Sequence, residues 1–287
     1  MNIQYRSKYL EEFIAEIQFK NRNPKNIKAL ELLEDLATNP VRIISEGADL
    51  FRCRIINDET KINKQQGFYG YGEQDSFIPP ACFARDLRAN YRYIPYLYCS
   101  NDPYTALVEV RPRMGAQISV ATIRVNETLK LLDFTMLNPP SLMTESKRDL
   151  FYDLSELYSK PVTVDDDIID YIPTQYIAEY VKNLGYDGIV FMSSLMPEIS
   201  EEVRKTILEK TPTMFDSINF DRFNVVVFNY EKCKAIKSNV VVASRVFMEF
   251  RQKDDDGYKL KVKSPLNELL TKRKKLTENL IEQMKRQ

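Results

Sequence analysis

The stretch YLYCSNDPYTALVEVRP, residues 96–112, places a strand, a turn and a helix in close succession. Its first residues are apolar and aromatic, as in a strand, and the polar run that follows ends in Asp102 and Pro103. Asp caps the free N–H groups of a helix and Pro fits its first turn, so we expect a short helix here. That helix carries a single carboxylate, Glu109, among apolar residues. A lone Glu of this kind usually faces solvent, and the alternative is a carboxylate held in a cleft.

The composition is that of an ordinary globular protein with no electrostatic preference for nucleic acid or acidic membranes. The chain has 287 residues, 44% of them hydrophobic, and its 41 basic residues balance its 41 acidic ones. No segment is apolar and long enough to span a bilayer, and the first residues lack the apolar core of a secretory signal. The four cysteines form no CxxC pair. We therefore expect a cytoplasmic protein without a metal site that binds neither membrane nor nucleic acid.

Histidine is absent from the chain, and this excludes several kinds of catalysis. Ser-His-Asp and Cys-His nucleophiles, HExxH metal sites and histidine acid–base chemistry all need an imidazole. An enzyme built from this sequence works with carboxylates, Arg, Lys, Tyr, Ser and backbone groups. Its reaction should have little need for a group that titrates near neutral pH.

The middle of the chain mixes strands and helices in an order that differs from regular βαβ alternation. β-Branched and aromatic runs predict six strands, at 50–56, 95–99, 118–125, 129–134, 187–192 and 224–228. Helices are expected at 148–159 and 174–185, the second capped by Thr174 and closed by Gly185. We therefore predict an α+β fold, with strands gathered into sheets and helices around them.

The two ends of the chain are predicted to be extensions of a central domain at 46–245. Residues 1–45 show the apolar spacing of helices, and residues 246–287 predict a hairpin followed by an amphipathic helix. The apolar stripe of that last helix needs a cover, either the domain itself or another subunit. Its acidic residues dilute its basic ones, which argues against a nucleic-acid tail.

Two arginines in the first predicted strand are candidates for binding an anion. Arg52 and Arg54 alternate with apolar residues and so point to one face of the strand. Two guanidinium groups side by side repel each other unless an anion, such as a phosphate, lies between them. The alternative is an edge strand with a solvated face, and this stretch alone leaves both interpretations open.

Further polar residues flank the later strands. Arg88 precedes the aromatic strand that contains Tyr98. Ser193 and Ser194 follow the strand of GYDGIVFM, and Asn224 begins the strand NVVVF. Polar side chains at strand ends are common in binding sites, although each of these signals is weak on its own.

The order of these motifs resembles the RES-domain family, which is named for its Arg, Glu and Ser. The features that carry the resemblance are Arg in a first strand, Arg-Ala-Asn before an aromatic strand, TAxxEVRP, TQYIAEY, GYDGI, a serine and NVVVF. It covers roughly residues 50–230. The resemblance implies a fold like that of ADP-ribosyltransferases and an enzyme that consumes NAD by phosphorolysis or hydrolysis. It also implies a toxin or defence effector, since several members are toxins held in check by an antitoxin.

The resemblance assigns the family positions to particular residues. The arginines fall on Arg52 and Arg88, the glutamate on Glu109 and the serine on Ser193, with Ser194 as the alternative one residue on. The aromatic position before the Glu helix falls on Tyr98, and the position before the last core strand on Asn224. Leu87 stands where the family usually has glycine.

These assignments fit the absence of histidine, because cleaving the nicotinamide–ribose bond expels a neutral pyridine that needs no proton. The reaction needs stabilisation of an oxocarbenium-like ribose, and we expect Glu109 to supply it. Arg52 and Arg88 would clamp the pyrophosphate of NAD or an inorganic phosphate co-substrate. Tyr98 would stack on the nicotinamide or its ribose, and Ser193 would hydrogen-bond a ribose hydroxyl or the carboxamide.

Other functions and several partners stay open on the sequence alone. The same site would serve an ADP-ribosyltransferase that modifies a macromolecule, and the scaffold could also belong to a non-catalytic binding protein. NAD is expected as a substrate rather than as a permanently bound cofactor. The expected protein partners are an antitoxin and a second copy of the chain, bound through the C-terminal helix.

Overall fold

The computed structural model of the chain describes residues 5–25, 27–36, 41–62, 67–135, 143–160, 167–195 and 222–244. One compact unit comprises Met1–Pro112 and Ala116–Val242, and all the elements below belong to it. The second unit comprises Arg113–Gly115 and Ala243–Gln287. Within that second unit the Gly115 N–H donates to the Ala243 carbonyl at 2.8 Å. The predicted C-terminal hairpin and amphipathic helix lie outside the described residues.

The described strands form one eight-stranded sheet in the order β1-β5-β6-β7-β3-β2-β4-β8. They are β1 (Val41–Ile44), β2 (Asp49–Ile55), β3 (Leu97–Ser100), β4 (Gln117–Val125), β5 (Leu129–Asp133), β6 (Gly188–Met192), β7 (Phe223–Val227) and β8 (Cys233–Val242). Among these pairs β5 and β6 run parallel, and the other neighbours are antiparallel.

The sheet has a seam between β3 and β2. These two strands meet at one register pair, Phe51 with Ser100, whereas β2 pairs with β4 along its whole length. The seam therefore separates a half built from β1, β5, β6, β7 and β3 from a half built from β2, β4 and β8. Beyond that single pair no register pairs join β2 to β3, so side chains at the seam can line a cavity.

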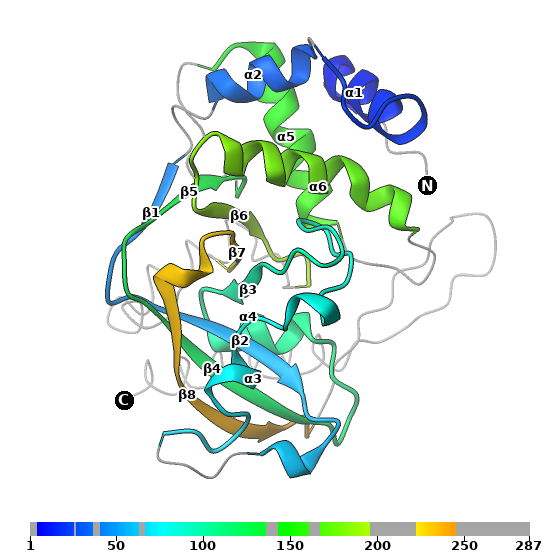
Figure 1. The fold of residues 1–287 in the computed structure, drawn as a ribbon. Coiled ribbons are helices and arrows are strands. Elements are labelled where there is room, and N and C mark those ends of the chain that lie inside the picture. Colours follow the sequence, from blue (N-terminus) through cyan, green and yellow to red (C-terminus); the bar gives the residue numbers. More distant parts are fainter. Residues whose placement is uncertain are drawn as a thin grey trace, which may run out of the picture. The chain divides into compact units, whose positions relative to one another are not determined.

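Four of the described helices gather beside the first half of the sheet, as Figure 1 shows. They are α1 (Lys8–Phe19), α2 (Lys28–Leu36), α5 (Glu145–Ser159) and α6 (Ile168–Asn183); the shorter α3 (Glu73–Ser76) and α4 (Pro103–Glu109) lie beside β2 and its neighbours. The apolar faces of α1, α2, α5 and α6 form one core cluster with residues of β5, β6 and β7. Within the described residues no helix is long and apolar enough to cross a membrane.

Strands β6 and β7 are buried on both faces, which explains their unbroken apolar sequences. Ile189 and Val226 enter the core cluster under the helices, whereas Val190 and Val225 enter a second cluster with β2, β4 and β8. The same alternation places Ser193, which follows β6, and Asn224, near the start of β7, on the side of the sheet that the helices cover. Gly188 allows the two strands to approach, because a Cβ there would lie 2.1 Å from the Val226 carbonyl oxygen.

The predicted α+β fold class is confirmed, and each of the six predicted strands is present. The helices predicted in the first 45 residues are also present as α1 and α2. The strand β1, which has only four residues, was not predicted. The apolar run at 240–250 predicts only the end of β8, because lysines interrupt the pattern in its first part. The boundaries proposed at residues 45 and 245 stay predictions, and α1 and α2 share the core cluster of α5 and α6.

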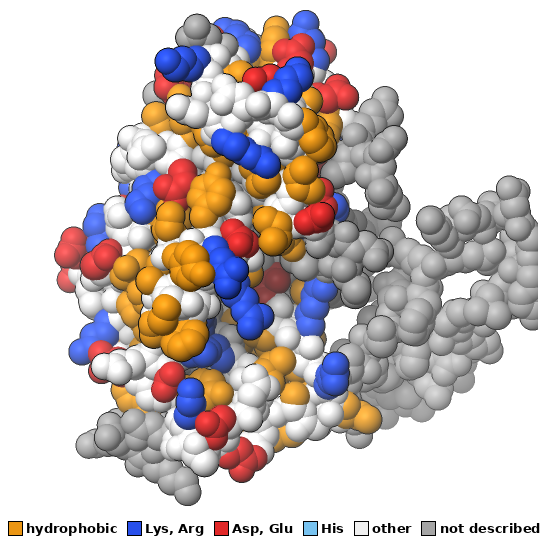
Figure 2. Space-filling view, turned by 45° about the vertical axis from the view of Figure 1, so that its right-hand side comes forward, with side chains coloured by type: hydrophobic (Ala, Val, Ile, Leu, Met, Phe, Trp, Pro, Cys, Tyr) orange, Lys and Arg blue, Asp and Glu red, His pale blue; other side chains and the backbone are white. Residues whose placement is uncertain are grey.

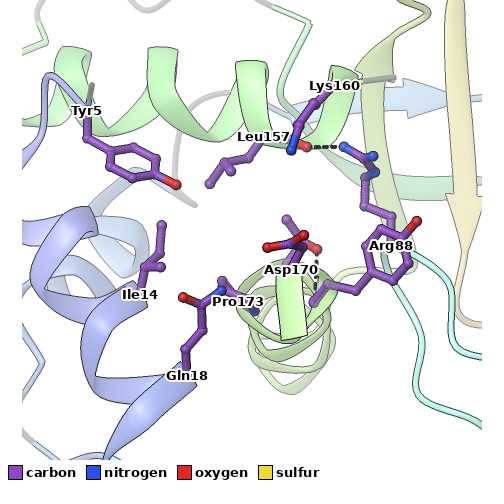
Figure 3. A pocket seen from close by; sticks show the side chains of 10 residues that line it. Tyr5, Ile14, Gln18, Arg88, Leu157, Lys160, Asp170 and Pro173 are labelled. Atoms are coloured by element: carbon purple, nitrogen blue, oxygen red, sulfur yellow. Dashed lines mark hydrogen bonds between the residues drawn. The ribbon is translucent and has the colours of Figure 1, made fainter. Parts of the chain in front are cut away.

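The predicted start of α6 at Thr174 is wrong. The helix begins at Ile168, where Asp167 and Asp170 form a capping box, and Pro173 lies inside it. Proline has no N–H, so the Ile169 carbonyl four residues earlier lacks its helical partner. Gln18 of α1 donates its Nε2 to that carbonyl at 3.0 Å, and Figure 3 shows Gln18 pointing toward Pro173. The helix therefore continues through a residue that normally ends one, because the N-terminal segment supplies the missing donor.

We predict that the contribution of Gln18 to stability depends on Pro173. Gln18→Ala should lower the free energy of unfolding by about 1 kcal/mol, the usual worth of such a hydrogen bond. In a Pro173→Ala background the loss should shrink, because the new N–H bonds to the Ile169 carbonyl. Urea unfolding of the four proteins measures this coupling. Glu12→Ala, an exposed change on the same helix, is the control, and equal losses in both backgrounds would contradict the assignment.

Candidate active site

Glu109 is placed by α4, whose start is fixed as the sequence predicted. The Asp102 carboxylate accepts the N–H groups of Tyr104 at 3.0 Å and Thr105 at 3.1 Å, and Pro103 occupies the first turn. These bonds satisfy donors that would otherwise lack partners at the helix N-terminus. The helix has only seven residues, so a defined start also defines the position of Glu109 at its end.

The Glu109 carboxylate is held by two side chains from neighbouring strands. Its Oε1 accepts the Ser193 hydroxyl at 2.7 Å and the Asn224 Nδ2 at 2.7 Å. Ser193 directly follows β6, and Asn224 lies in β7 opposite Phe191. Among the described residues, Oε2 has no hydrogen-bond partner. Glu109 is thus a half-buried carboxylate in a cleft, not a side chain on the wet face of α4.

A cavity of about 550 Å³ opens beside this carboxylate. This volume lies in the range of small-molecule sites. Five of the six residues assigned from the resemblance line it, and they are Arg52, Arg88, Tyr98, Glu109 and Asn224. The sixth, Ser193, does not line the cavity but is hydrogen-bonded to Glu109, which does, and Ser194 is part of the cavity wall. The structure thus brings together residues spread over more than half of the chain.

Arg52 carries a buried positive charge that the described part of the protein does not neutralise. Its Nε and Nη1 atoms are shielded from solvent and have no hydrogen-bond partner among the described residues. Burial lowers the pKa of Arg52 to about 10, so the group stays protonated at neutral pH. A buried charge without a partner is costly, and an anion in the cavity would relieve that cost.

The two arginines of β2 differ in their surroundings. Arg54 donates to the Asp75 carbonyl at α3 and lies 5.2 Å from the centre of the Tyr71 ring. It is therefore occupied by the protein itself, whereas Arg52 faces the cavity. The alternative of a solvated edge strand is wrong, because β2 lies between β3 and β4.

Arg88 lies on the wall between this cavity and a smaller one of about 50 Å³. Figure 3 shows the smaller cavity, which α1, α5 and α6 enclose, and the bond from Arg88 to the Leu157 carbonyl. Leu157 belongs to the last turn of α5, where free carbonyls attract cations. Arg88 also lies 5.8 Å from the centre of the Tyr171 ring. Part of its binding capacity is thus used within the protein.

Tyr98 presents a fixed ring to the cavity. Its hydroxyl donates to Asn90 Oδ1 at 2.8 Å and accepts the Ala89 N–H at 3.1 Å. Burial raises the pKa of Tyr98 well above its usual range, so the phenol is neutral. Gln175 of α6 holds the same loop through the Leu87 and Asn90 carbonyls, both at 2.9 Å. The Arg-Ala-Asn and TQY motifs therefore shape the wall on which Tyr98 lies.

Further polar residues that line the cavity were not predicted from the sequence, and they include Ser100, Arg111, Ser159 and Lys160. Ser100 and Arg111 belong to the stretch 96–112, where nothing in the local pattern distinguishes them from surface residues. Arg111 has a φ of 46°, which is unusual for a residue other than glycine. Lys160 follows the last turn of α5, and its position depends on where that helix packs. Figure 2 shows Lys and Arg side chains around a hollow in the face that it presents.

Comparison with known protein families finds a match in the middle of the chain. The family model of the RES domain matches residues 67–208, a range that includes Arg88, Tyr98, Glu109 and Ser193. Residues 67–208 thus match the RES-domain family, as the resemblance of the motifs predicted. Arg52 and Asn224 lie outside the matched range and join the site through the fold.

One solved structure is similar to the chain at low sequence identity. It is the crystal structure of the M. tuberculosis MbcT-MbcA toxin-antitoxin complex, which is 13% identical with a TM-score of 0.40. The match covers 75% of this chain and 94% of the other. No curated protein sequence matches the chain significantly.

We predict that Arg52 is the main anion-binding group of the cavity. Arg52→Met should weaken the binding of pyrophosphate by about 1.5–3 kcal/mol, the value of hydrogen bonds to a charged group. Titration calorimetry of the folded variant measures this loss. Arg54→Met removes the same charge from the same strand and should leave binding nearly unchanged. Equal affinity of the Arg52 variant and the parent would refute the prediction.

The backbone at Arg111 gives a separate prediction about stability. A positive φ costs a side-chain-bearing residue energy that glycine avoids. Arg111→Gly should therefore be more stable than Arg111→Ala by about 1 kcal/mol, measured by thermal unfolding. At Arg124, in the regular strand β4, the same pair of changes should show the opposite order. If alanine is the better replacement at both positions, the backbone at 111 is not strained.

Proposed function

We propose that the chain is an enzyme that degrades NAD by cleaving its nicotinamide–ribose bond, and that it acts as a toxin or defence effector. One observation carries the proposal. Within the described residues, the Glu109 carboxylate has one oxygen fixed by Ser193 and Asn224 and the other without a partner, and the cavity also holds the Arg52 guanidinium, which no described group neutralises. A ligand with a developing positive charge near a ribose and a negative pyrophosphate some distance away matches both groups.

Cleavage of the nicotinamide–ribose bond does not require the protein to protonate the leaving group. When the bond between the ribose C1′ and the nicotinamide nitrogen breaks, its electron pair neutralises the pyridinium, and neutral nicotinamide leaves. The positive charge then develops on the ribose, where Glu109 Oε2 would stabilise it. This division of charge explains how a chain without histidine could catalyse the reaction.

The remaining residues would hold the substrate. Arg52 would bind the pyrophosphate or an inorganic phosphate, with Arg88 at the edge of the cavity. Tyr98 would offer its ring face to the nicotinamide or ribose, since its hydroxyl is already bonded. The Ser193 hydroxyl donates a hydrogen bond to Glu109. Toward a ligand it would therefore accept a hydrogen bond from a ribose hydroxyl or from the carboxamide NH₂ group.

The product distinguishes the versions of this function. In phosphorolysis a phosphate oxygen bonds to C1′ and gives a phosphorylated ADP-ribose. In hydrolysis water bonds there, loses a proton to solvent and gives ADP-ribose. Incubation of the purified full chain with NAD, with and without phosphate, followed by product analysis, separates the two. Turnover only when a macromolecular target is added would indicate an ADP-ribosyltransferase, and binding without turnover a non-catalytic protein.

The partners proposed from the sequence stay predictions. An antitoxin would suit a toxin of this family, and a second copy of the chain was expected to bind through the C-terminal helix. That helix lies outside the described residues. The cytoplasmic location is likewise a prediction.

We predict that Glu109→Gln leaves the fold intact and lowers the kcat for NAD about 10²–10³-fold, the typical loss of one electrostatic stabiliser. The amide keeps the size of the side chain but carries no charge to stabilise the ribose. Glu127→Gln, on an exposed loop, is the matched control and should keep full activity. Nicotinamide release by the two variants measures the effect, and unchanged kinetics in the Glu109 variant would rule out this role.

A further inference from the structure

Ser100 is a buried hydroxyl directly behind the Glu109 contacts. It is the last residue of β3, only 3% exposed, and its side chain donates to Asn224 Oδ1 at 2.7 Å. Asn224 in turn donates to Glu109. The three side chains form a chain of hydrogen bonds in which Glu109 is the only one assigned to chemistry so far. The family resemblance gives Ser100 no role.

The direction of these bonds follows from what each group can do. An ionised carboxylate only accepts hydrogen bonds, so the side of the Asn224 amide that faces Glu109 must be the NH₂ group. The amide carbonyl then faces the opposite way, toward Ser100. Only a donor suits that position, and the Ser100 hydroxyl provides one. Without it, the amide could turn over and present its carbonyl to the carboxylate.

Strand register holds the two residues in place. Ser100 and Asn224 are direct partners in the antiparallel pairing of β3 with β7. Asn101 extends that pairing, since its Oδ1 accepts the Phe223 N–H at 3.0 Å and its own N–H donates to the Phe223 carbonyl at 3.1 Å. The next residue, Asp102, caps α4. Residues 100–102 thus connect the strand pairing at Asn224 to the start of α4, the helix that ends in Glu109.

We propose that Ser100 is a positioning residue, which fixes the Asn224 amide so that Glu109 keeps Oε1 engaged and turns Oε2 toward the cavity. The proposal rests on the role given to Glu109 under the proposed function. It assigns to Ser100 an effect on the rate of bond cleavage rather than on substrate binding. The Ser100 hydroxyl is already bonded to Asn224, and through Asn224 it affects the position of the catalytic carboxylate.

Steady-state kinetics on the full chain test this effect. Ser100→Ala should lower kcat for NAD ~10-fold or more and leave KM little changed. Loss of a residue that orients a metal ligand has an effect of this size in other enzymes. Ser100→Thr keeps a hydroxyl in place and should recover most of kcat. If the added methyl prevents folding, Ser100→Cys offers a weaker donor of similar shape, for which we expect an intermediate kcat. A purely structural residue would give a lower unfolding temperature with the kcat of the folded protein unchanged, and that result would overturn the proposal.

A second measurement does not depend on NAD turnover. The side-chain amide of Asn224 can be assigned by ¹⁵N NMR from its absence in an Asn224→Ala variant. In the parent and in Ser100→Thr we expect slow hydrogen exchange at this amide and a chemical shift that moves in Glu109→Gln. In Ser100→Ala exchange should be faster and the response to Glu109→Gln should be lost.

The two measurements separate failure of this proposal from failure of the proposed function. A parent that does not cleave NAD, together with an Asn224 amide that responds to Ser100→Ala, refutes the NAD reaction and supports the positioning role. A parent that cleaves NAD, together with an amide and a kcat that ignore Ser100→Ala, refutes the positioning role alone.

Discussion

The pairing of β3 with β7 is the constraint on which the candidate site depends. Four consecutive register pairs set β3 against β7, whereas a single pair joins β3 to β2 on its other side. Strong pairing on one side fixes Ser100 opposite Asn224, and weak pairing on the other leaves Arg52 beside an open cavity. The same strand leads directly into α4, so Glu109 inherits its position from this register. A shift of one residue would turn these side chains to the opposite face.

The charges in the cavity are arranged unequally. Glu109 has two donors from the protein on one of its oxygens, while Arg52 has shielded nitrogens without partners among the described residues. The carboxylate is thus held in place by the protein itself, whereas the guanidinium has no such support from the described residues. A carboxylate that is held in place in advance, like Glu109, favours a fast chemical step. An unsatisfied charge, like that of Arg52, lowers the stability of the empty protein and favours the binding of an anion.

The sequence predicted the residues whose chemistry is distinctive and missed those whose role depends on packing. Glu109 was identifiable as a charge within an apolar helix, and Ser193 and Asn224 as polar residues at strand ends. Ser100, Arg111 and Lys160 lack such a signal, because only the strand register, a backbone angle and the packing of α5 bring them to the cavity. The start of α6 was misplaced for the same reason, since the donor that lets Pro173 lie inside a helix comes from another helix far away in the chain.

The bond between Gln18 and the Ile169 carbonyl also affects how the chain can be divided. Residues 1–45 precede the matched family range, and a fragment that omits them would look reasonable from a family alignment. Such a fragment would expose the apolar faces of α5 and α6 and leave a carbonyl of α6 without its donor. Because Gln175 on the same helix holds the loop under Tyr98, damage at this distant end would reach the wall of the cavity. The N-terminal helices thus share a core with the helix that holds this wall, and the stability of the shortened chain would show how far the matched family range folds without them.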